Sequence, residues 1–550
     1  MKRITTILLL VIMTITATAT SCLKRQGTAT QLIVNGEPML VLGGELSNSA
    51  ATAPADIDKV MSKMKDIGLN TVLVPAQWDL LEPTEGHFDF TLVDEVINNA
   101  RKHQLKIIFL WFGAWKNSMS CYAPLWFKEN TRKYPRACTA TGKPLEIASA
   151  FSKNVMEADK NAFCHLMQHI KEVDSKETTV IMVQVENEIG MLESARDHSP
   201  LAEKAYKEWV SNGMDRKMAY DFSLPQDYQD EVFQAYHYAK YVEQLASAGK
   251  NIYNIPLYVN AAMNSRGRTP GQYPSAGPLA HLIYIWKQCA PSIDLFTPDI
   301  YDTGFKDWVK KYDFTDMPFF TPETRLDTNS GIKAVYTIGA TDAIGYSVFA
   351  IDQASNKEKW SVTDGYTMLT TLSPLLLKWR GQKPMWGVLF DQEDKERIID
   401  DNGTIITARH YYTLPWDPRA SDGSKWPEGG AIVVRLAKNE YVIAGRGVVV
   451  TFQTRTEQSQ ASELKRGEDG FIAASDGETP SNDPKMKQKE TNGMFYGRRL
   501  GLGYVDQVTV DADGNMQYVR RDNGDQDHQG RHARISCDGY KILHIKLYEY

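Results

Sequence analysis

The sequence predicts an α/β fold, a closed (β/α)8 TIM barrel followed by a C-terminal antiparallel β-sandwich. Between residues 31 and 375, apolar runs alternate eight times with segments of helical spacing. After about residue 380, the runs become short and rich in β-branched residues. Eight strand–helix units in succession favour a closed barrel over an open doubly wound sheet. No GxGxxG motif follows the first run, which argues against a dinucleotide-binding fold.

The eight expected strands are short apolar runs. The fourth is a continuous run of branched residues that ends in Glu186-Asn187-Glu188. Such a run is typical of a parallel strand buried on both faces. The polar groups after it would lie at the rim where barrel enzymes carry their chemistry. The expected strands are Met39–Gly44, Asn70–Pro75, Leu105–Trp111, Thr179–Glu186, Pro256–Val259, Leu295–Ile300, Phe319–Thr321 and Gly345–Phe349.

Helices are expected where apolar residues recur every three or four positions. Gly68 follows the first such segment and is a typical C-terminal stop. The expected helices are Asp56–Ile67, Leu92–His103, Lys160–Val173, Tyr228–Ala248, Leu279–Cys289, Phe305–Tyr312, Ser330–Ile338 and Tyr366–Trp379. The barrel is therefore expected to cover residues 31–378.

Residues 379–550 are expected to form one antiparallel β domain, because β-rich runs alternate with polar turns. A charged segment, residues 457–489, is expected to be a long insertion. Residues 523–532 could bind a metal or a sugar, but their Asn, Asp and Gly favour a solvated turn. The expected strands are Ala431–Ala437, Tyr441–Phe452, Phe471–Ala474, Tyr504–Val510, Met516–Val519 and Lys541–Leu547.

Length and charge narrow the classes of function. A chain of 550 residues accommodates a barrel of about 250 residues or more together with a smaller domain. The formal net charge of -6 gives no reason to expect nucleic acid or an anionic membrane surface as a partner. The 12 Trp and 26 Tyr are generous, and flat aromatic rings suit the apolar faces of sugars.

Residues 1–22 are expected to be a lipoprotein signal peptide. A basic start is followed by an apolar run, to about residue 19, that is too short to span a bilayer comfortably. Small residues precede Cys22, so cleavage before Cys22 and its acylation are expected, although Ala19 stands where such signals carry a larger apolar residue. An ordinary cleaved signal is the alternative. The expected location is the periplasm or outer membrane surface of a Gram-negative bacterium, with a lipid anchor as the membrane contact.

The other cysteines give no zinc-site spacing. Cys121 and Cys138 lie in one polar stretch and could form a disulfide in an oxidising compartment. Equally, both could be free thiols.

Glu188 and Glu323 are the candidate catalytic pair. They would follow strands four and seven, so they would face each other across the mouth of the barrel. Glycoside hydrolysis needs such a pair, because one carboxyl protonates the leaving oxygen and the other attacks the anomeric carbon. A separation of about 5–5.5 Å would retain the anomeric configuration. The alternatives are an acidic turn for Glu188 and a helix N-terminal acid after Pro322 for Glu323.

Several motifs resemble the family 35 β-galactosidases, within the large clan of retaining barrel glycosidases. Residues 184–190, Gln-Val-Glu-Asn-Glu-Ile-Gly, are similar to that family's acid/base motif. Residues 69–72, Leu-Asn-Thr-Val, and 77–79, Gln-Trp-Asp, are similar to its second-strand signature. Residues 439–443, Asn-Glu-Tyr-Val-Ile, resemble a motif of its C-terminal β domain. The resemblance covers residues 31–350 well and the remainder more thinly.

The resemblance implies that Glu188 is the acid/base, that Glu323 is the nucleophile and that Asn187 hydrogen-bonds the sugar 2-hydroxyl. Tyr301, at the end of strand six, resembles the clan's tyrosine near the nucleophile. The activity it implies is that of an exo-acting β-galactosidase, which releases terminal β-linked galactose from oligo- or polysaccharides. This hydrolysis needs no cofactor or metal.

Three sugar-binding positions depart from the family pattern. Residues 43–48 read Gly-Gly-Glu-Leu-Ser-Asn where the family carries a His-Tyr after strand one. Residues 112–117 read Phe-Gly-Ala-Trp-Lys-Asn where it carries Ala-Glu-Trp, and Pro75 replaces a tyrosine. The galactose assignment is therefore weaker than the reaction type, and another β-linked sugar stays open.

Further residues could line the mouth because of their place after the strands. A Trp at a strand end more often packs in the core than against a sugar. Glu45 could bind sugar hydroxyls or pair with a Lys or Arg, and Glu186 is expected to be a structural partner. The candidates are Glu45, Asn48, Trp78, Trp115 and Asn260.

Two other classes of function compete with a glycosidase. A carbohydrate-binding lipoprotein could keep the barrel without catalysis, but the presence of both Glu188 and Glu323 argues against it. A metal-dependent barrel hydrolase would collect His and Asp at the strand ends, where this chain carries Asn, Glu and Tyr. The eleven His form no convincing ligand cluster, so no metal is expected. The oligomeric state and the cleaved linkage are left open.

Overall fold

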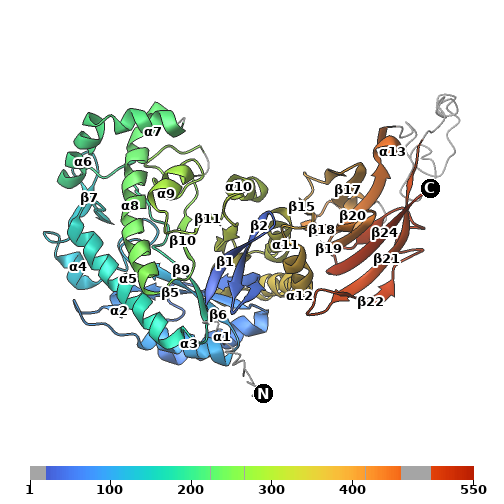
Figure 1. Cartoon of the computed structure of the whole chain (residues 1–550), viewed down its shortest axis with the longest axis horizontal. Helices are drawn as coiled ribbons and strands as arrows, with labels where there is room; N and C mark the ends of the chain where they lie inside the picture. Colours follow the sequence, from blue (N-terminus) through green and yellow to red (C-terminus); the bar gives the residue numbers. More distant parts are fainter. Residues whose placement is uncertain (1–19, 223–224, 265–266, 415–416, 460–496) are drawn as a thin grey trace, which may run out of the picture.

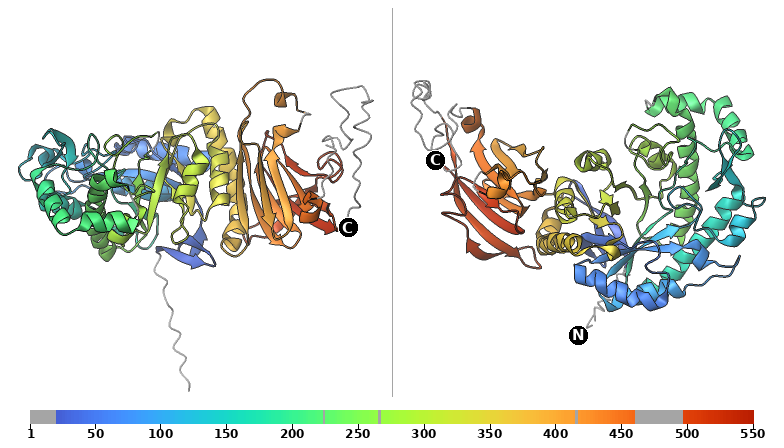
Figure 2. Two further views of the ribbon diagram at one scale, coloured as in Figure 1. Left: turned by 90° about the horizontal axis from the view of Figure 1, so that it is seen from above. Right: turned by 180° about the vertical axis from the view of Figure 1, so that it is seen from behind.

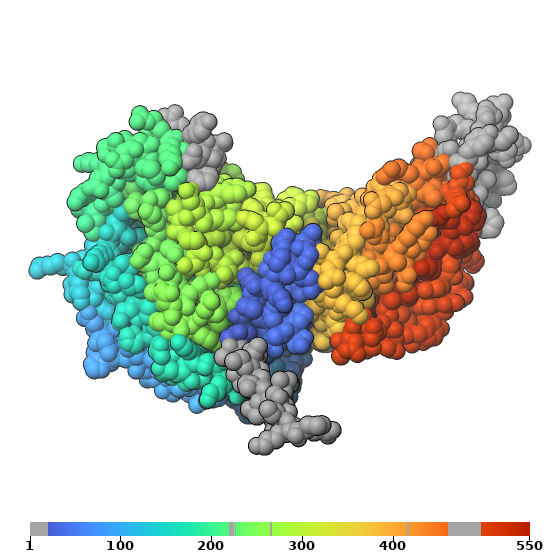
Figure 3. All heavy atoms as spheres, viewed as in Figure 1, coloured from blue at the N-terminus to red at the C-terminus, as the bar shows by residue number. Residues whose placement is uncertain are grey.

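The computed structural model describes residues 20–222, 225–264, 267–414, 417–459 and 497–550. A parallel, nearly closed barrel and a pair of antiparallel sheets lie side by side (Figure 1), so the predicted fold class is confirmed. The surface is hollowed between the barrel, in green, and the C-terminal sheets, in orange (Figure 3). Residues 1–19 of the expected signal peptide, the expected strand at 471–474 and most of the expected insertion lie outside the described residues.

The eight barrel strands pair in chain order, and each begins within two residues of its predicted start. Their side chains alternate between the barrel interior and the surrounding helices, and both sets are buried. The strands are β4 (Val41–Glu45), β5 (Thr71–Gln77), β6 (Lys106–Phe112), β9 (Val180–Gln184), β10 (Leu257–Ala261), β11 (Leu295–Ile300), β12 (Phe320–Thr321) with β13 (Glu323–Thr324), and β14 (Gly345–Val348).

The seventh strand is split at Pro322, which has no N–H to donate to a neighbouring strand. Its first half, β12, pairs with β14, and its second half, β13, pairs with β11. The two halves thereby join the two edges of the sheet. Glu323 is the first residue of β13, opposite Asp299 of β11.

Helices surround the barrel where the helical spacing predicts them. Gly68 ends the first helix with a φ of 94°, in the left-handed region that glycine adopts freely. The long connections after strands two, three and four hold further elements: α2 (Trp78–Leu81), α4 (Leu125–Glu129), β7 (Arg136–Cys138), β8 (Pro144–Ala148), α6 (Pro200–Ser211) and α7 (Met214–Phe222). The helices that follow the strands are α1 (Pro54–Ile67), α3 (Thr91–Lys102), α5 (Lys153–Asp174), α8 (Gln229–Ile252), α9 (Ile283–Cys289), α10 (Phe305–Tyr312), α11 (Ser330–Ala340) and α12 (Asn356–Trp379).

A small antiparallel sheet closes the floor of the barrel, at the N-terminal ends of its strands. Leu32 and Val34 pack with the apolar side chains that fill the barrel interior. The hydroxyl of Ser21 donates a hydrogen bond to the carbonyl of Ile181, near the start of β9. The sheet consists of β1 (Ser21–Gln26), β2 (Ala29–Val34) and β3 (Glu37–Met39).

Two antiparallel sheets form the C-terminal sandwich, seen from two sides in Figure 2. Apolar residues such as Val433 and Val450 fill the space between them. The other face of the larger sheet packs on α11 and α12, where Ile432 and Ala444 join the core around the barrel. The larger sheet has the order β15 (Met385–Phe390), β18 (Gly429–Ala437), β19 (Glu440–Arg446), β24 (Lys541–Glu549), β21 (Leu500–Val510) and β22 (Met516–Arg521); the smaller has β16 (Glu396–Asp401), β17 (Thr404–His410), β20 (Val448–Thr454) and β23 (Ala533–Ile535).

One predicted strand of this domain is wrong. The run 441–452 forms two strands, β19 and β20, because the chain turns at Gly447 with a φ of 67° and crosses from one sheet to the other. Residues 523–532 form turns, as expected. Cys121 and Cys138 are free thiols. In the ranges described, no helix combines the length and the apolar character needed to cross a membrane.

Candidate active site

The two predicted acids meet in the mouth of the barrel. Carboxylate oxygens of Glu188, Asp299 and Glu323 lie within 4.8 Å of one another, and all three side chains are buried. A separation of this size matches the paired carboxylates of a retaining glycosidase better than the wider pair of an inverting one. An inverting enzyme would place its two carboxyl groups about 6.5–9.5 Å apart to make room for the attacking water.

Glu323 is held by three side chains from neighbouring strand ends. The Tyr301 hydroxyl donates to its Oε2 at 2.6 Å, and the amide of Asn187 donates to its Oε1 at 3.2 Å. The Asn260 amide approaches the same Oε1 at 3.4 Å. All three donors are neutral groups that orient the carboxylate, which suits a nucleophile. The predicted residues Asn187, Tyr301 and Asn260 are thus brought together around Glu323.

Glu188 lies in a different environment. Its backbone N–H donates to Asn260 Oδ1 at 2.9 Å, and the Asn117 amide donates to its carboxylate. Burial, and then the negative charge of Glu323, raise the pKa of Glu188 to about 7, although Lys116, Asp299 and Asn117 lower it. A carboxyl with this pKa is protonated in part at neutral pH and can act as a general acid.

The loop that carries Glu188 is held against the loop after strand three. Glu186 and Glu188 adopt left-handed backbone conformations, with φ of 60° and 44°, which are uncommon for residues other than glycine. Backbone hydrogen bonds from Asn187 to Trp115, and from Ser118 to Glu188, join the two loops at 3.2 Å each. Glu186 accepts from the Trp115 N–H at 2.8 Å, so it is the expected structural partner.

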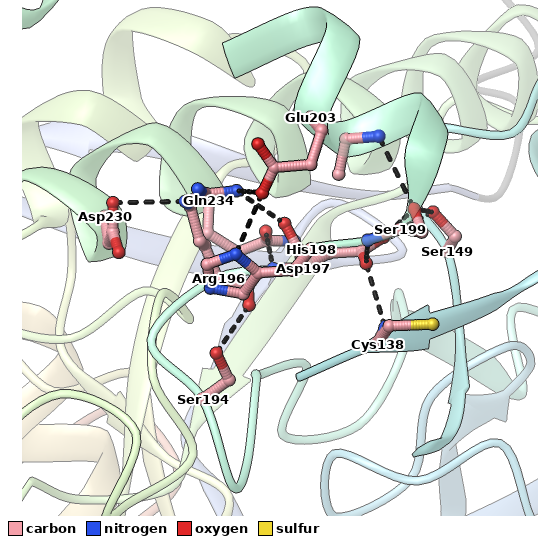
Figure 4. Close-up of polar contacts among 11 residues, drawn as sticks. Cys138, Ser149, Ser194, Arg196, Asp197, His198, Ser199, Glu203, Asp230 and Gln234 are labelled. Atoms are coloured by element: carbon pink, nitrogen blue, oxygen red, sulfur yellow. Dashed lines mark hydrogen bonds and ion pairs between the residues drawn. The ribbon is translucent and has the colours of Figure 1, made fainter. Parts of the chain in front are cut away.

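A buried polar cluster anchors the next part of the same connection (Figure 4). Asp197 accepts hydrogen bonds from the backbone N–H of Cys138 at 3.0 Å and of Ser199 at 2.6 Å. The Arg196 guanidinium forms ion pairs with Glu203 at 2.8 Å and with Asp230 at 3.1 Å. Cys138 belongs to β7, Glu203 to α6 and Asp230 to α8. The cluster therefore attaches the segment that follows Glu188 to the elements around the barrel.

Lys116 is an active-site residue that the sequence reasoning missed. Its side chain is buried, and its Nζ lies 4.7 Å from the centre of the Phe112 ring. Burial alone would lower the pKa of Lys116, but the negative charges of Glu323, Glu45, Glu188 and Asp299 raise it above its usual value. Lys116 therefore stays a cation among four carboxyl groups.

Asp299 is the second missed residue. It accepts from the Asn260 amide at 2.6 Å. Burial, followed by the charges of Glu323, Glu188 and Glu45, raises its pKa well above the usual value, although Lys116 lowers it, so the protonated carboxyl, which can donate a hydrogen bond, is favoured at this position. Alternation along β11 would have signalled it, because Asp299 and Thr297 point the same way, towards the interior.

Glu45, at the end of β4, has carboxylate oxygens that are available to a ligand in the mouth of the barrel. Its side chain is buried, and neither carboxylate oxygen has a hydrogen-bond partner among the described residues. Burial and the charge of Glu323 raise its pKa well above the usual value, although Lys116 lowers it. A buried carboxyl without partners is costly unless a bound molecule satisfies it.

Two residues that were predicted to contact the substrate, Trp78 and Trp115, are buried in the structure. Trp78 has no exposed surface, packs against Phe127 with ring centres 5.1 Å apart, and donates to Glu82. Trp115 is also fully buried and packs edge-on against Tyr241. Both rings lie on the helix side of the sheet, so they are core rather than sugar platforms.

Asn48 lies at the side of the mouth. Its backbone carbonyl accepts from Gln77 at 2.7 Å, and its amide contacts the Tyr122 hydroxyl. These contacts tie it to the loops after strands two and three, and no hydrogen bond joins it to the described carboxylates of the site.

Glu188, Asp299 and Glu323 are also the side chains that could offer oxygen ligands to a metal ion, within the described part of the chain. Their oxygens already accept hydrogen bonds from Tyr301 and from amide groups. A divalent cation would have to displace these donors and ionise Asp299. The donor set fits hydrolysis by carboxyl groups better, and the absence of a metal stays a prediction.

Two family models match parts of the chain. Residues 50–220 match a glycoside hydrolase family 42 model described as Beta-galactosidase, and residues 362–534 match a domain of unknown function, DUF5597. The first match includes Glu188 and indicates a glycosidase, as predicted. The matching model is that of family 42, and the resemblance to family 35 is not confirmed. No curated protein matches the chain.

Several solved β-galactosidase structures are similar at low identity. Those from Marinomonas ef1 (TM-score 0.47, 12% identity) and Halorubrum lacusprofundi (0.46, 15%) align with 60% and 62% of this chain and the same shares of their own. One from G. stearothermophilus (0.48, 16%) aligns with 64% of this chain and 58% of its own. The chain thus covers about three fifths of these proteins.

Proposed function

We propose that this chain is a retaining exo-β-galactosidase that releases terminal β-linked galactose from oligo- or polysaccharides. The observation that carries the proposal is the pair of buried carboxyl groups within 4.8 Å, one of them with a pKa near 7. Glu188 is the acid/base and Glu323 the nucleophile. The family 42 match, described as Beta-galactosidase, supports the choice of sugar.

In the first step, the protonated Glu188 gives its proton to the glycosidic oxygen. The bond from that oxygen to the anomeric carbon breaks, and a Glu323 oxygen forms a new bond to the same carbon. In the second step, Glu188 takes a proton from water, the water oxygen attacks the anomeric carbon and Glu323 leaves. Two inversions retain the configuration of the sugar.

The sugar itself would be held by acceptors that the free protein leaves unused. Asn187 Oδ1 and both oxygens of Glu45 are buried and have no hydrogen-bond partner among the described residues. Sugar hydroxyls supply the missing donors. Asn187 lies beside Glu323, which would bond to the anomeric carbon. The 2-hydroxyl, on the neighbouring carbon of the sugar, would therefore lie within reach of Asn187.

Initial rates on a panel of nitrophenyl β-glycosides test this function. The galactoside is expected to be the preferred substrate. Preference for another glycoside would keep the mechanism but rule out galactose as the preferred sugar. Another β-linked sugar is the first alternative, because the residues after strands one and three depart from the family pattern. Binding of galactose without turnover of any glycoside would favour a non-catalytic carbohydrate-binding protein.

The pKa of Glu188 predicts the basic limb of the activity profile. The acid must be protonated to act, so kcat/KM is expected to fall about tenfold per pH unit above a pH of about 7. The profile is measured between about pH 5 and 9 with an alkyl β-galactoside, whose leaving oxygen needs the proton. In Glu188→Gln, which cannot titrate, the limb disappears. A wild-type profile that stays flat to about pH 9 would contradict the role of Glu188.

We propose further that the protein is exported and lipid-anchored through Cys22, whose side chain is exposed in β1. Expressed in a Gram-negative host, the protein is expected in the membrane fraction, with a diacylglyceryl group on the N-terminal peptide by mass spectrometry. Cys22→Ser is expected to lose both, and Cys121→Ser serves as the matched control. If the chain is cleaved but Cys22 carries no lipid, the N-terminal segment is an ordinary signal peptide and the lipid anchor is ruled out.

A further inference from the structure

A large cleft lies beside the mouth of the barrel, between the barrel rim and the C-terminal sheets. Its volume of about 940 Å³ is at the upper end of the range of ligand pockets. Tyr301, Thr324 and Arg325 line it from the ends of strands six and seven, and Phe390, Trp426 and Glu428 line it from the C-terminal domain. In Figure 3 the surface is hollowed between these two parts of the molecule.

The cleft begins at the active site itself. Tyr301, which lines it, donates to the Glu323 carboxylate at 2.6 Å. Thr324 is the residue directly after Glu323. A molecule bound between Glu188 and Glu323 could therefore extend into the cleft without crossing a strand.

The order of the barrel strands says which part of a substrate would enter it. Glu188 follows strand four and Glu323 begins the second half of strand seven, so strands one, two, three and eight lie on one side of the pair and strands five and six on the other. The unpartnered Glu45 and the cation Lys116 come from strands one and three, which assigns the galactose to that side. The cleft runs from the end of strand six along the loop after strand seven to the C-terminal domain. Its part beside strand six is on the side opposite Glu45 and Lys116, where the leaving group would lie.

The lining of the cleft suits a chain of neutral sugars. It carries charged residues of both signs, such as Asp302 and Lys425, together with apolar rings. Glu428 Oε2 is buried and has no hydrogen-bond partner among the described residues, and burial raises the pKa of that carboxyl. The Arg325 side chain is exposed at the rim, and its Nε donates to the Tyr301 carbonyl at 2.9 Å. Arg325 therefore offers its remaining N–H groups beside the nucleophile.

We propose that this interdomain cleft binds the carbohydrate chain from which the galactose is released, with Glu428 and Arg325 as its main polar contacts. The inference rests on the proposed function and adds a substrate class to it, because a site that holds several sugar units selects oligosaccharides over small galactosides. The C-terminal β domain then takes part directly in substrate recognition.

The test compares kcat/KM for β-1,4-galactotetraose and β-1,4-galactobiose in the full-length protein. Both substrates present the same terminal bond, so the ratio of the two values cancels effects on the chemistry. The wild type is expected to prefer the tetraose by about tenfold or more. Glu428→Ala and Arg325→Ala are each expected to lower that ratio several-fold, because each removes a hydrogen bond of a charged group. The matched controls are Glu396→Ala and Arg132→Ala, which are exposed and outside the cleft.

A wild-type ratio near one, or a ratio that the two cleft variants leave unchanged, would overturn the proposal while the galactosidase activity stands. If neither oligosaccharide nor any nitrophenyl β-galactoside is hydrolysed, the proposed function fails instead. Calorimetric titration of Glu188→Gln with galactotetraose then decides about the cleft. Binding that is weakened by the added Glu428→Ala supports it, and equal or absent binding in both variants overturns it.

Discussion

Glu323→Gln is expected to lower kcat/KM on nitrophenyl β-galactoside at least about 10⁴-fold, and Glu188→Gln about 10²- to 10⁴-fold. The first change removes the oxygen that bonds to the anomeric carbon. The second removes the proton donor, so its cost depends on the leaving group. A dinitrophenyl galactoside, whose leaving oxygen needs no proton, is expected to suffer much less in the first step of Glu188→Gln than an alkyl galactoside.

Azide distinguishes the two roles. In Glu188→Ala, a small anion can enter the space of the acid/base and attack the glycosyl–enzyme bond, which gives β-galactosyl azide. In Glu323→Ala, azide replaces the nucleophile itself and gives the α-azide. The products are assigned by nuclear magnetic resonance.

Glu177→Gln is the matched control, an exposed glutamate in the turn before β9 at the floor of the barrel. It is expected to keep wild-type rates. If activity survives in both catalytic variants, or if both give the same azide product, the two-carboxylate mechanism is wrong for this chain.

Lys116→Met is expected to have the second largest effect, on stability rather than on the chemical step. Removing the cation leaves buried carboxylates uncompensated, which costs about 3–5 kcal/mol in typical buried pairs. Lys116 lowers the pKa of Glu45, Glu188 and Asp299, so each of these pKa values is expected to rise further in the variant.

The sign of the pH dependence follows from those shifts. A carboxyl whose pKa is raised on folding lowers the stability of the native state as the pH rises from the pKa of the unfolded chain to that of the native state, and the loss is complete above the native pKa. The loss of stability in Lys116→Met is therefore expected to be largest above a pH of about 7, the pKa of Glu188, and to shrink as the pH falls below that value. Denaturant unfolding of both proteins, followed by tryptophan fluorescence, measures the difference.

Lys153→Met, an exposed lysine at the start of α5, is the matched control and should show no such trend. A stability difference that is independent of pH would mean that Lys116 contributes packing alone. The basic limb of the activity profile offers a second readout, because it should move to higher pH together with the pKa of Glu188.

The barrel was predictable because each strand and helix carries its own periodicity. The starts of the strands need only local pattern, and Gly68 marks a helix end by its backbone preference. The split of strand seven could not be predicted from the sequence. Pro322 explains why the strand breaks, but it does not tell which neighbouring strand each half pairs with. The β19–β20 crossover was missed for a similar reason: the run 441–452 reads as continuously β-rich, and only the left-handed Gly447 separates its halves.

At the mouth of the barrel, position along the chain predicted which side chains the structure brings together at the ends of strands four to seven: Glu188, Asn260, Tyr301 and Glu323. It could not place Lys116, which lies in an irregular loop four residues after β6. Nor could it tell a rim tryptophan from a buried one. Trp78 and Trp115 follow strand ends in sequence, but the rings turn back into the core because large aromatic rings gain more from burial than from an aqueous mouth.

The closed floor of the barrel has a consequence for how the molecule would stand on a membrane. Cys22 is the second residue of β1, so the chain reaches the floor sheet with no intervening tether. Cleavage before Cys22 would cost the Ser21 bond to Ile181 but keep the rest of the sheet. A lipid on Cys22 would then hold the floor against the bilayer, and the mouth with Glu188 and Glu323, at the other end of the same strands, would open away from it. Such an enzyme would bind its polysaccharide on the side that faces away from the membrane.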